Sequence, residues 1–361
     1  MRNIIDMKKV LVIGGGISGT FSAIRIKEKH PSYDVMIFDH NDRLLKKIYV
    51  TGNGKCNFSN QGLLLDKYSN ADFALNIINE FNNDSIREYF DSIGVKSKAI
   101  NDLIYPYSES AESVAKKLLS KVEELGIKVC LNTNVLDYDC KELITDKGPY
   151  PYDALVVSVG GLSNPKLGSN GSFYPSLKKH GYIFNEPHPS LCPIKTKENT
   201  KMVEGLRSKV TASLYQKEKL IHEEEGELLF KKDGLSGIVI FNMTHYINRL
   251  NSLNDITIHL DFAKGVDGDI DSLVHPRIAK YLLDNKLDIH DTKFTFKSFY
   301  DYDFSQVTSG GIDIKQINND LSSKIEKNVY FIGEVIDVDA ICGGYNIMWA
   351  LASGDKVSSK I

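Results

Sequence analysis

The sequence predicts an α/β fold: a parallel, doubly wound sheet that carries an inserted β-rich domain. An apolar run, Lys8–Ile13, stops at the glycines of GGGISG (residues 14–19) and leads directly into a helical pattern. Segments in which apolar and polar residues alternate, as in half-exposed antiparallel strands, gather between residues 191 and 304. Strand-then-helix patterns return after this stretch, so the first domain is predicted to be discontinuous.

The opening glycines have the spacing G-x-G-x-x-G, with Asp39 following the second strand twenty residues after Gly19. In this arrangement Gly14 permits a tight turn, Gly16 lets a pyrophosphate approach the backbone, and Gly19 lets the helix pack on the strand. Asp39 can accept hydrogen bonds from ribose hydroxyls, and the helix N-terminus offers unpaired N–H groups. The pattern predicts a dinucleotide site; a ligand-free glycine turn is the alternative.

The first domain is expected to contain a regular succession of strands and helices. After strand Lys8–Ile13, the expected elements are helix Ser18–Lys29, strand Asp34–Asp39, loop Thr51–Asn57, helices Asp72–Phe81, Asp84–Ile93 and Ala111–Leu125, and strands Ile127–Leu131 and Asp153–Val159. The last strand is continuously apolar, as expected of a parallel strand buried on both faces. It ends at Gly160-Gly161.

The inserted region is expected to be antiparallel and barrel-like. Its predicted strands are Val210–Tyr215, Glu227–Phe230, Asp255–Phe262 and Lys293–Phe299, with a helical stretch Asp271–Leu283 interrupted by Pro276. Strand Asn328–Ile332 and a helix that opens at Gly343 then return to the first pattern. We therefore predict a cofactor-binding domain from residues 1–190 and 305–361, and a substrate or cap domain from residues 191–304.

Bulk properties narrow the classes of partner. The chain has 361 residues, more than one hydrophobic core usually serves, which favours two domains. Its net charge is −3 without a long basic block, so nucleic acid is not an expected partner, whereas a small-molecule substrate is. No apolar run is long enough to span a bilayer and no signal-peptide core precedes the first strand, which predicts no membrane association and a cytoplasmic location. Residues 1–6, before Met7, are expected to be a dispensable leader. The oligomeric state is left open.

Cysteine and histidine give no sign of a metal site. The five cysteines are scattered without a C-x-x-C pair, so neither a metal site nor a dithiol motif is predicted, and most are expected to be buried, reduced thiols. Cys56 is expected to be packed rather than redox-active, and Trp349 to belong to the core. His180 and His188 have no carboxylate or cysteine at ligand spacing, and they are interpreted as ordinary surface or loop histidines.

A second glycine-bearing helix start lies near the C-terminus. The N–H groups of Gly343-Gly344-Tyr345-Asn346 can face the N1–C2=O edge of a flavin, where they would stabilise the charge of the reduced ring. Glu334 follows a parallel strand, at the edge where ligands collect, and can accept hydrogen bonds from ribityl hydroxyls. The alternative is that this segment merely begins a helix and that Glu334 is a surface residue.

These segments resemble a bacterial family of NAD(P)/FAD-dependent oxidoreductases that includes dehydro-bile-acid reductases and aminoacetone oxidases. The resemblance rests on SVGG (158–161), PSLCP (189–193), GELLF (226–230), GLSG (234–237), VTSGG (307–311), GEVIDVD (333–339) and GGYN (343–346). It implies FAD in a glutathione-reductase-like Rossmann domain, with the β-rich domain covering the flavin. It also implies that Val135 contacts adenine and that Thr51–Asn57 lie along the flavin ring.

The expected cofactor contacts come from the glycine turns together with this resemblance. They are Gly14, Gly16, Ile17, Ser18, Gly19, Asp39, Lys47, Thr51, Gly52, Asn53, Gly54, Cys56, Asn57, Val135, Gly160, Gly161, Gly333, Glu334, Gly343, Gly344, Tyr345 and Asn346. No catalytic group stands out, since paired carboxylates, a Cys/His couple and a Ser/His/Asp set are all absent at diagnostic spacing. Tyr345 is the candidate that is left: it can donate a proton or simply cover the flavin.

The expected function is that of an FAD-dependent oxidoreductase that reduces an activated alkene with electrons from NAD(P)H through flavin N5. No second G-x-G-x-x-G occurs, so NAD(P)H would bind transiently at the flavin face. A flavin amine oxidase that uses dioxygen is one alternative. A flavin-binding redox sensor or accessory protein without turnover is another, and plain NAD binding at the first glycine turn is a third.

Overall fold

A computed structural model describes residues 7–62 and 66–361. The predicted leader, residues 1–6, lies outside the described residues. The chain divides into two compact units, and each is described by itself: unit 1 comprises residues 1–187 and 310–361, and unit 2 comprises residues 188–309. The chain passes between them in β11 (Phe184–Ser190) and β18 (Val307–Ile312), which pair as a two-stranded sheet.

Unit 1 is built on a five-stranded sheet with the order β19-β10-β1-β2-β6. Its strands are β1 (Lys9–Ile13), β2 (Asp34–Phe38), β6 (Lys128–Cys130), β10 (Ala154–Val157) and β19 (Val329–Phe331). All neighbouring pairs are parallel. Every residue of β10 is buried, which explains its unbroken apolar sequence.

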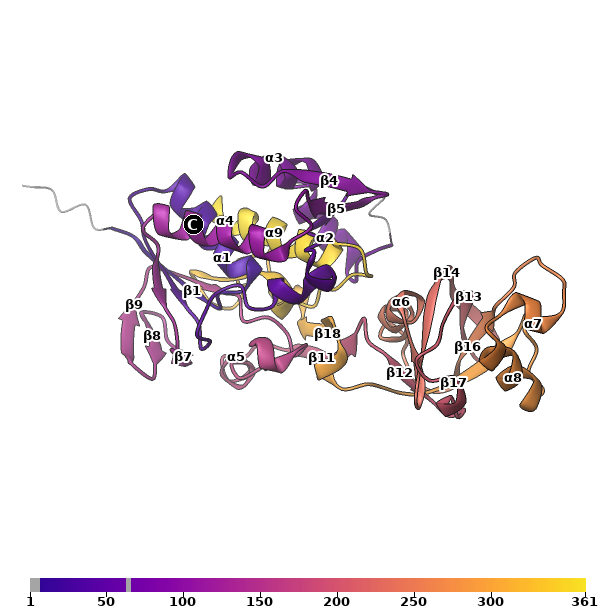
Figure 1. The fold of residues 1–361 in the computed structure, drawn as a ribbon. Coiled ribbons are helices and arrows are strands. Elements are labelled where there is room, and N and C mark those ends of the chain that lie inside the picture. The colour runs from indigo at the N-terminus through magenta and orange to yellow at the C-terminus, as the bar shows by residue number, and fades with distance from the viewer. Residues whose placement is uncertain (1–6, 63–65) are drawn as a thin grey trace, which may run out of the picture. The chain divides into compact units, whose positions relative to one another are not determined.

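Helices and small antiparallel sheets surround this parallel sheet. The helices are α1 (Ile17–Lys29), α2 (Ala71–Ile78), α3 (Asn83–Ser92), α4 (Ala111–Glu124), α5 (Tyr174–Lys179) and α9 (Tyr345–Ser358). Strands β3 (Ser59–Asn60), β5 (Leu103–Pro106) and β4 (Ser97–Ile100) form one small sheet, and β7 (Val135–Tyr138), β8 (Glu142–Thr145) and β9 (Gly148–Pro151) form another. The C-terminal helix α9 packs along α1, at the N-terminal end of the chain (Figure 1).

Short 3₁₀ turns complete unit 1. They are η1 (Ile48–Gly54), η2 (Pro165–Leu167), η5 (Ile314–Gln316) and η6 (Gly333–Val335). The predicted loop 51–57 thus begins inside η1, where Gly52 and Asn53 have φ values of 56° and 55°. The left-handed conformation at both residues prevents the turn from continuing as a helix.

Unit 2 is a closed barrel of six strands in the order β12-β15-β14-β13-β16-β17. The strands are β12 (Ile194–Thr196), β13 (Arg207–Gln216), β14 (Lys219–Lys231), β15 (Gly234–Ser236), β16 (Ile256–Asp261) and β17 (Thr292–Phe299), all in antiparallel pairs. Closure leaves no unpaired edge. The predicted fold class, a Rossmann-type α/β domain with an antiparallel, barrel-like insertion, is confirmed.

The helices of unit 2 differ from the prediction. Helix α6 (Ile238–Ile247) was not predicted, because its apolar residues do not alternate with polar ones in a helical pattern, and most of it is buried. The predicted stretch 271–283 is two helices, α7 (Ile270–Leu273) and α8 (Pro276–Asp284), and Pro276 stands in the first turn of α8, where it is tolerated. The remaining turns are η3 (Lys201–Val203) and η4 (Tyr302–Phe304).

The cysteine prediction was partly wrong. Cys56 and Cys192 are buried, but Cys130 and Cys342 are half-buried and Cys140 is exposed. Trp349, with 2% of its surface exposed, belongs to the core as predicted.

Candidate cofactor site

The opening glycine turn leaves space on one side only. A Cβ atom on Gly14, whose φ is 98°, would lie 2.2 Å from the carbonyl oxygen of Ser158, and one on Gly19 would lie 2.0 Å from the carbonyl oxygen of Gly14. These two positions therefore require glycine for strand–strand and helix–strand packing. A Cβ atom on Gly16 would meet nothing within 4 Å. Gly16 is the N-cap of α1, so this open space lies at the N-terminus of a helix whose first N–H groups have no partner inside the helix.

Asp39 holds this turn from the end of β2. Its Oδ2 accepts a hydrogen bond from the Gly15 N–H at 2.7 Å, and its Oδ1 accepts from the backbone and side-chain nitrogens of Asn41 at 2.8 and 3.0 Å. The carboxylate is buried, yet it retains acceptor capacity for a ribose hydroxyl. The Thr133 N–H donates to the carbonyl oxygen of Asp39, which places the chain leading to Val135 in β7 beside the same residue.

The C-terminal segment lies against the beginning of α1. A Cβ atom on Gly333 would lie 2.5 Å from Ser18 Oγ. The Gly333 N–H donates to Ser353 Oγ at 3.0 Å, and Trp349 Nε1 donates to the Gly333 carbonyl oxygen at 3.1 Å. Helix α9 therefore fixes the end of β19 next to the first turn of α1. Two segments more than 300 residues apart in sequence meet at this point.

A polar cluster of Lys47, Ser163 and Glu334 stands beside Gly333. Lys47 Nζ lies 2.8 Å from Ser163 Oγ and 3.2 Å from Glu334 Oε2, and Ser163 Oγ lies 3.0 Å from Glu334 Oε1. The sequence did not suggest Ser163, which follows the Gly160-Gly161 pair at the end of β10. All three side chains come from the carboxyl ends of strands or from loops beside them, where ligands of α/β sheets bind.

The loop 51–57 meets the beginning of α9. The Asn60 side-chain amide donates to the Gly343 carbonyl oxygen at 2.8 Å, and a Cβ atom on Gly344 would lie 2.7 Å from Asn57 Oδ1. Asn57 Oδ1 is buried and has no hydrogen-bond partner. Such an orphaned acceptor is costly, which suggests that a ligand donates to it.

The turn 51–57 itself is held by its own backbone and side chains. Thr51 Oγ1 donates to the Ile48 carbonyl oxygen at 2.7 Å, and the Cys56 N–H donates to the Thr51 carbonyl oxygen at 3.0 Å. Gly54 and Cys56 also have positive φ values, 83° and 57°. Burial raises the pKa of the Cys56 thiol to about 12, so this sulfur is protonated at neutral pH. That charge state fits the predicted packing role and disfavours a reactive thiolate.

Tyr345 and Asn346 begin α9 in different environments. Tyr345 is buried, and its carbonyl oxygen accepts a hydrogen bond from Tyr68 Oη at 2.8 Å. Burial, together with the charge of Asp102, raises the pKa of the Tyr345 hydroxyl, which keeps its proton at neutral pH. The Asn346 side chain pairs with the backbone N–H and carbonyl of Ala340 at 2.9 and 2.8 Å, so it closes the preceding loop.

His180, interpreted as an ordinary surface or loop histidine, lies between two carboxylates. Its Nδ1 lies 2.9 Å from Glu326 Oε1 and its Nε2 lies 2.9 Å from Asp137 Oδ1, while its ring stacks on Tyr138 with centroids 4.0 Å apart. Both carboxylates are distant in sequence, so local spacing carried no signal. Both ring nitrogens therefore lie within hydrogen-bond distance of a carboxylate oxygen. The cluster joins β7, the end of α5 and the chain before β19.

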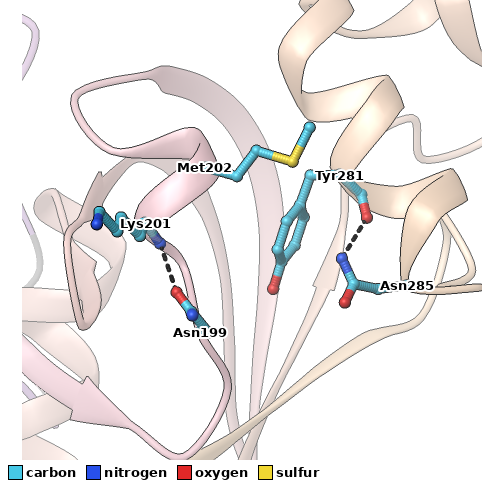
Figure 2. Close-up of a pocket in the computed structure, with 5 residues that line it drawn as sticks. All are labelled: Asn199, Lys201, Met202, Tyr281 and Asn285. Carbon is cyan, nitrogen blue, oxygen red and sulfur yellow. Dashed lines mark hydrogen bonds between the residues drawn. The ribbon is translucent and has the colours of Figure 1, made fainter.

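Unit 2 contains a separate open pocket of about 510 Å³, lined by Asn199, Lys201, Met202, Tyr281 and Asn285. Figure 2 shows the Tyr281 ring between Met202 and Asn285, with the Lys201 side chain pointing away from it. None of the residues predicted to contact the cofactor lines this pocket, so it is not the predicted cofactor site. Its polar side chains are engaged locally: the Lys201 N–H donates to Asn199 Oδ1, and Asn285 Nδ2 donates to the Tyr281 carbonyl oxygen.

Two negative findings concern residues 7–62 and 66–361. Across these residues, no group of three or more His, Cys, Asp and Glu side chains is arranged to hold a metal ion. Within the same ranges, no helix combines the length and apolar character needed to cross a membrane.

Residues 8–360 match the family described as HI0933-like protein Rossmann domain. The match covers nearly the whole chain. The chain belongs to this family. Both units are therefore parts of one HI0933-like protein, although the barrel of unit 2 interrupts the Rossmann domain in sequence.

Curated proteins that resemble this HI0933-like chain have different names. A 3-dehydro-bile acid delta(4,6)-reductase from Clostridium scindens is 26% identical, and the alignment covers 96% of this chain and 97% of the relative. A ribosomal RNA dihydrouridine synthase from Haemophilus influenzae is also 26% identical, over 95% of this chain and 96% of the relative. A synthase of the same name from Escherichia coli is 22% identical, over 95% of each chain.

Solved structures support the fold. The open conformation of a flavocytochrome c3 fumarate reductase aligns with a TM-score of 0.53 at 13% identity, over 98% of this chain and 78% of that one. The quinol fumarate reductase of Escherichia coli aligns with a TM-score of 0.54 at 11% identity, over 98% and 70% of the two chains. At these identities the likeness establishes the architecture of the HI0933-like chain and nothing about its substrate.

Proposed function

We propose that this chain is an FAD-dependent oxidoreductase that reduces a carbon–carbon double bond conjugated to a carbonyl group, with NAD(P)H as the electron source. One observation carries the proposal. Unit 1 contains three polar or open places: the Gly16 turn, the Lys47–Ser163–Glu334 cluster and the helix start at Gly343–Gly344. Gly333 approaches Ser18 at the beginning of α1, and Gly344 approaches Asn57 in the loop 51–57, so the C-terminal segment meets both. An elongated cofactor needs such a succession of sites.

The residues at these three places fit the three parts of FAD. The first turn of α1 would hold the pyrophosphate, with Asp39 at the adenosine ribose and Val135 at the adenine. Glu334 and Lys47 would face the ribityl chain. The segment 51–57 and the beginning of α9 would border the flavin ring, where the orphaned Asn57 Oδ1 can accept a hydrogen bond from a ring N–H.

When bound, FAD supplies a flavin ring that accepts a hydride from a reduced nicotinamide and passes it to an acceptor. Saturating a conjugated double bond also requires a proton on the second carbon, and the protein or solvent must deliver it. Tyr345 is our candidate donor, because its hydroxyl keeps its proton at neutral pH and its residue borders the proposed flavin position. After transfer the phenolate would recover a proton from solvent.

The names of the relatives support this class of substrate. Reduction of a delta(4,6) system in a 3-dehydro bile acid and formation of dihydrouridine from uridine both saturate a carbon–carbon double bond. In each case the bond is conjugated to a carbonyl, so hydride addition leaves a stabilised enolate. We propose a small molecule of this kind as substrate. Unit 2, whose residue range is close to that of the predicted cap domain 191–304, would bind this substrate, and unit 1 would bind the cofactor.

A uridine in RNA is the second candidate substrate, since two relatives named as ribosomal RNA dihydrouridine synthases align over 95% of this chain. The charge of the chain argues against it. Residues 188–309 contain 16 Lys and Arg against 18 Asp and Glu, so unit 2 lacks the positive excess with which proteins usually bind phosphate backbones. A small-molecule substrate therefore remains the first candidate.

The deciding experiment is an anaerobic titration of the FAD-loaded protein with NADH and NADPH. Bleaching of the flavin absorbance by either nucleotide is expected, followed by reoxidation with a cyclic enone. Recovery by a uridine-containing RNA, and not by the enone, would favour the second candidate. Hydrogen peroxide release with amines would instead identify an amine oxidase, and no reduction by any donor would identify a redox sensor. A protein that stays colourless with FAD supplied would refute the proposal.

A further inference from the structure

The two strands that join the units, β11 and β18, meet the C-terminal segment 333–346 at one point inside unit 1. A Cβ atom on Gly310, in β18, would lie 2.5 Å from the carbonyl oxygen of Glu186 in β11. A Cβ atom on the next residue, Gly311, would lie 2.6 Å from the carbonyl oxygen of Val335 in η6. Three backbones therefore approach so closely that only glycine fits at both positions. This explains the glycines of VTSGG (307–311), which the proposed cofactor site does not use.

The side chain of Asp337 binds both joining strands at this point. Its Oδ2 accepts a hydrogen bond from Asn185 Nδ2 on β11 at 2.7 Å, and its Oδ1 accepts from the Gly310 N–H on β18 at 3.1 Å. The Asp337 N–H donates to the Ile312 carbonyl oxygen at 3.1 Å. One carboxylate thus connects the strand that leaves unit 1 and the strand that returns to it. We call Asn185, Gly310, Gly311 and Asp337 the linker junction.

The linker junction is continuous with the proposed cofactor site. Asp337 lies four residues after Gly333, which contacts Ser18, and three after Glu334, which pairs with Lys47. Asn70 Nδ2 donates to the Asp337 carbonyl oxygen at 2.6 Å and fixes the segment from the other side. Burial, first, and the nearby charge of Asp339 raise the pKa of the Asp337 carboxyl, which agrees with a desolvated anchor.

We propose that Asp337 is a positioning residue that couples the cofactor segment, residues 333–346, to the two strands that carry the barrel unit. The identity of the cofactor in this proposal rests on the proposed function. The role of Asp337 as an anchor of the two strands does not depend on it. Binding of FAD reduces the motion of the segment 333–346. Because Asp337 is hydrogen-bonded to both β11 and β18, the motion of these strands is reduced as well. The attachment of the substrate unit then responds to the loading of the cofactor site.

The first test compares amide hydrogen exchange in the ligand-free wild type, Asp337→Ala and Asn185→Ala. Exchange in peptides covering 184–187 and 310–312 is expected to accelerate about tenfold in Asp337→Ala and less in Asn185→Ala, which removes only one of the two partners. The matched control is Asp313→Asn, which alters a carboxylate next to β18 that caps Lys315 instead. Equal exchange in wild type and Asp337→Ala would overturn the anchor, and Asn185→Ala decides the question if Asp337→Ala fails to fold.

The second test adds FAD. In wild type, FAD is expected to slow exchange in peptides 184–187 and 310–312 severalfold. In Asp337→Ala it should still slow exchange in peptides 14–19, but not in the two linker peptides. FAD binding without any change in the wild-type linker peptides would overturn the coupling and leave the proposed function intact. Failure of wild type to bind FAD would refute the proposed function and with it the coupling, while the ligand-free exchange rates still decide whether Asp337 is an anchor.

Discussion

Single residues of the opening turn have different physical roles, although the motif makes them look alike. Gly14 and Gly19 are required because another backbone oxygen occupies the place of a side chain. Gly16 has free space there, with an extended backbone that any residue can adopt. Packing therefore does not explain its glycine, whereas the proposed pyrophosphate site does. The two kinds of position can be separated by experiment.

Gly16→Ala is expected to leave stability unchanged and to weaken FAD binding about tenfold or more, a loss of ~1.4 kcal/mol, because the new methyl group occupies the space of the pyrophosphate. Gly19→Ala should lower the free energy of unfolding by ~1–3 kcal/mol through overpacking. Urea unfolding of the ligand-free proteins and FAD titration measure the two effects. Equal destabilisation by both substitutions would contradict the distinction.

We predict that the Asp137 carboxylate stabilises the fold at neutral pH and that this stabilisation is lost in acid. Burial acts to raise the pKa of Asp137, but hydrogen bonds from Lys179, Ser176 and His180 outweigh it and hold the pKa well below the ordinary value of 3.8. A group whose pKa is lower in the folded than in the unfolded state stabilises the fold above its unfolded pKa. That stabilisation is lost as the pH falls through the folded pKa.

Asp137→Asn is therefore expected to lower the free energy of unfolding by ~1–3 kcal/mol at pH 7, because charge-assisted hydrogen bonds to Lys179 and His180 are lost. The difference from wild type should shrink steadily below about pH 4, where the wild-type carboxylate begins to lose its advantage. Urea unfolding across pH 3–7 measures it. A difference that stays constant over this range would show that the carboxylate charge is not the cause.

At the scale of elements, α9 supports the candidate site by holding the end of β19. Trp349 and Ser353, on successive turns of α9, bind the carbonyl and the N–H of Gly333. The helix was predicted from its glycine start, but its partners were not, because residues 333 and 349 have no periodic relation that a sequence reveals. The packing of α9 along α1 completes the arrangement.

Trp349→Phe keeps most of the buried ring but leaves the Gly333 carbonyl oxygen without its donor. We expect a loss of ~1–3 kcal/mol in the free energy of unfolding and weaker FAD binding, since Gly333 also borders Ser18. Circular dichroism follows the unfolding. Phe73→Leu is the matched control, because Phe73 contacts the Trp349 ring but not Gly333, and it should leave FAD affinity unchanged. Equal FAD affinity in wild type and Trp349→Phe would contradict the supporting role of α9.

At the scale of the whole molecule, the insertion is an independent hydrophobic unit. Its core, from Ile194 to Phe296, consists mainly of residues from the barrel strands, α6 and α8. Barrel closure satisfies the strand edges within the unit. Such a unit has the features of a domain that folds alone.

Residues 188–309, expressed alone, are expected to unfold in a single cooperative transition by circular dichroism and calorimetry. Unit 1 with residues 188–309 replaced by a short glycine–serine loop should fold and bind FAD, because its two cut ends already meet where Gly310 contacts Glu186. Turnover should be lost if unit 2 binds the acceptor substrate. Loss of FAD binding in the shortened protein would instead place part of the cofactor site in unit 2.

The sequence by itself determined the features that depend on neighbouring residues. The glycine turn after β1, the parallel strands, the alternating strands of the insertion and the helix after Gly344 all follow from local backbone requirements and short periodicities. The tertiary structure decided which residues distant in sequence come into contact. It brought Gly333 to Ser18, joined Lys47 with Ser163 and Glu334, enclosed His180 between Asp137 and Glu326, and placed Asp337 on both joining strands. Pairing of this kind depends on how the chain closes on itself, and residues distant in one sequence leave no local pattern that records it.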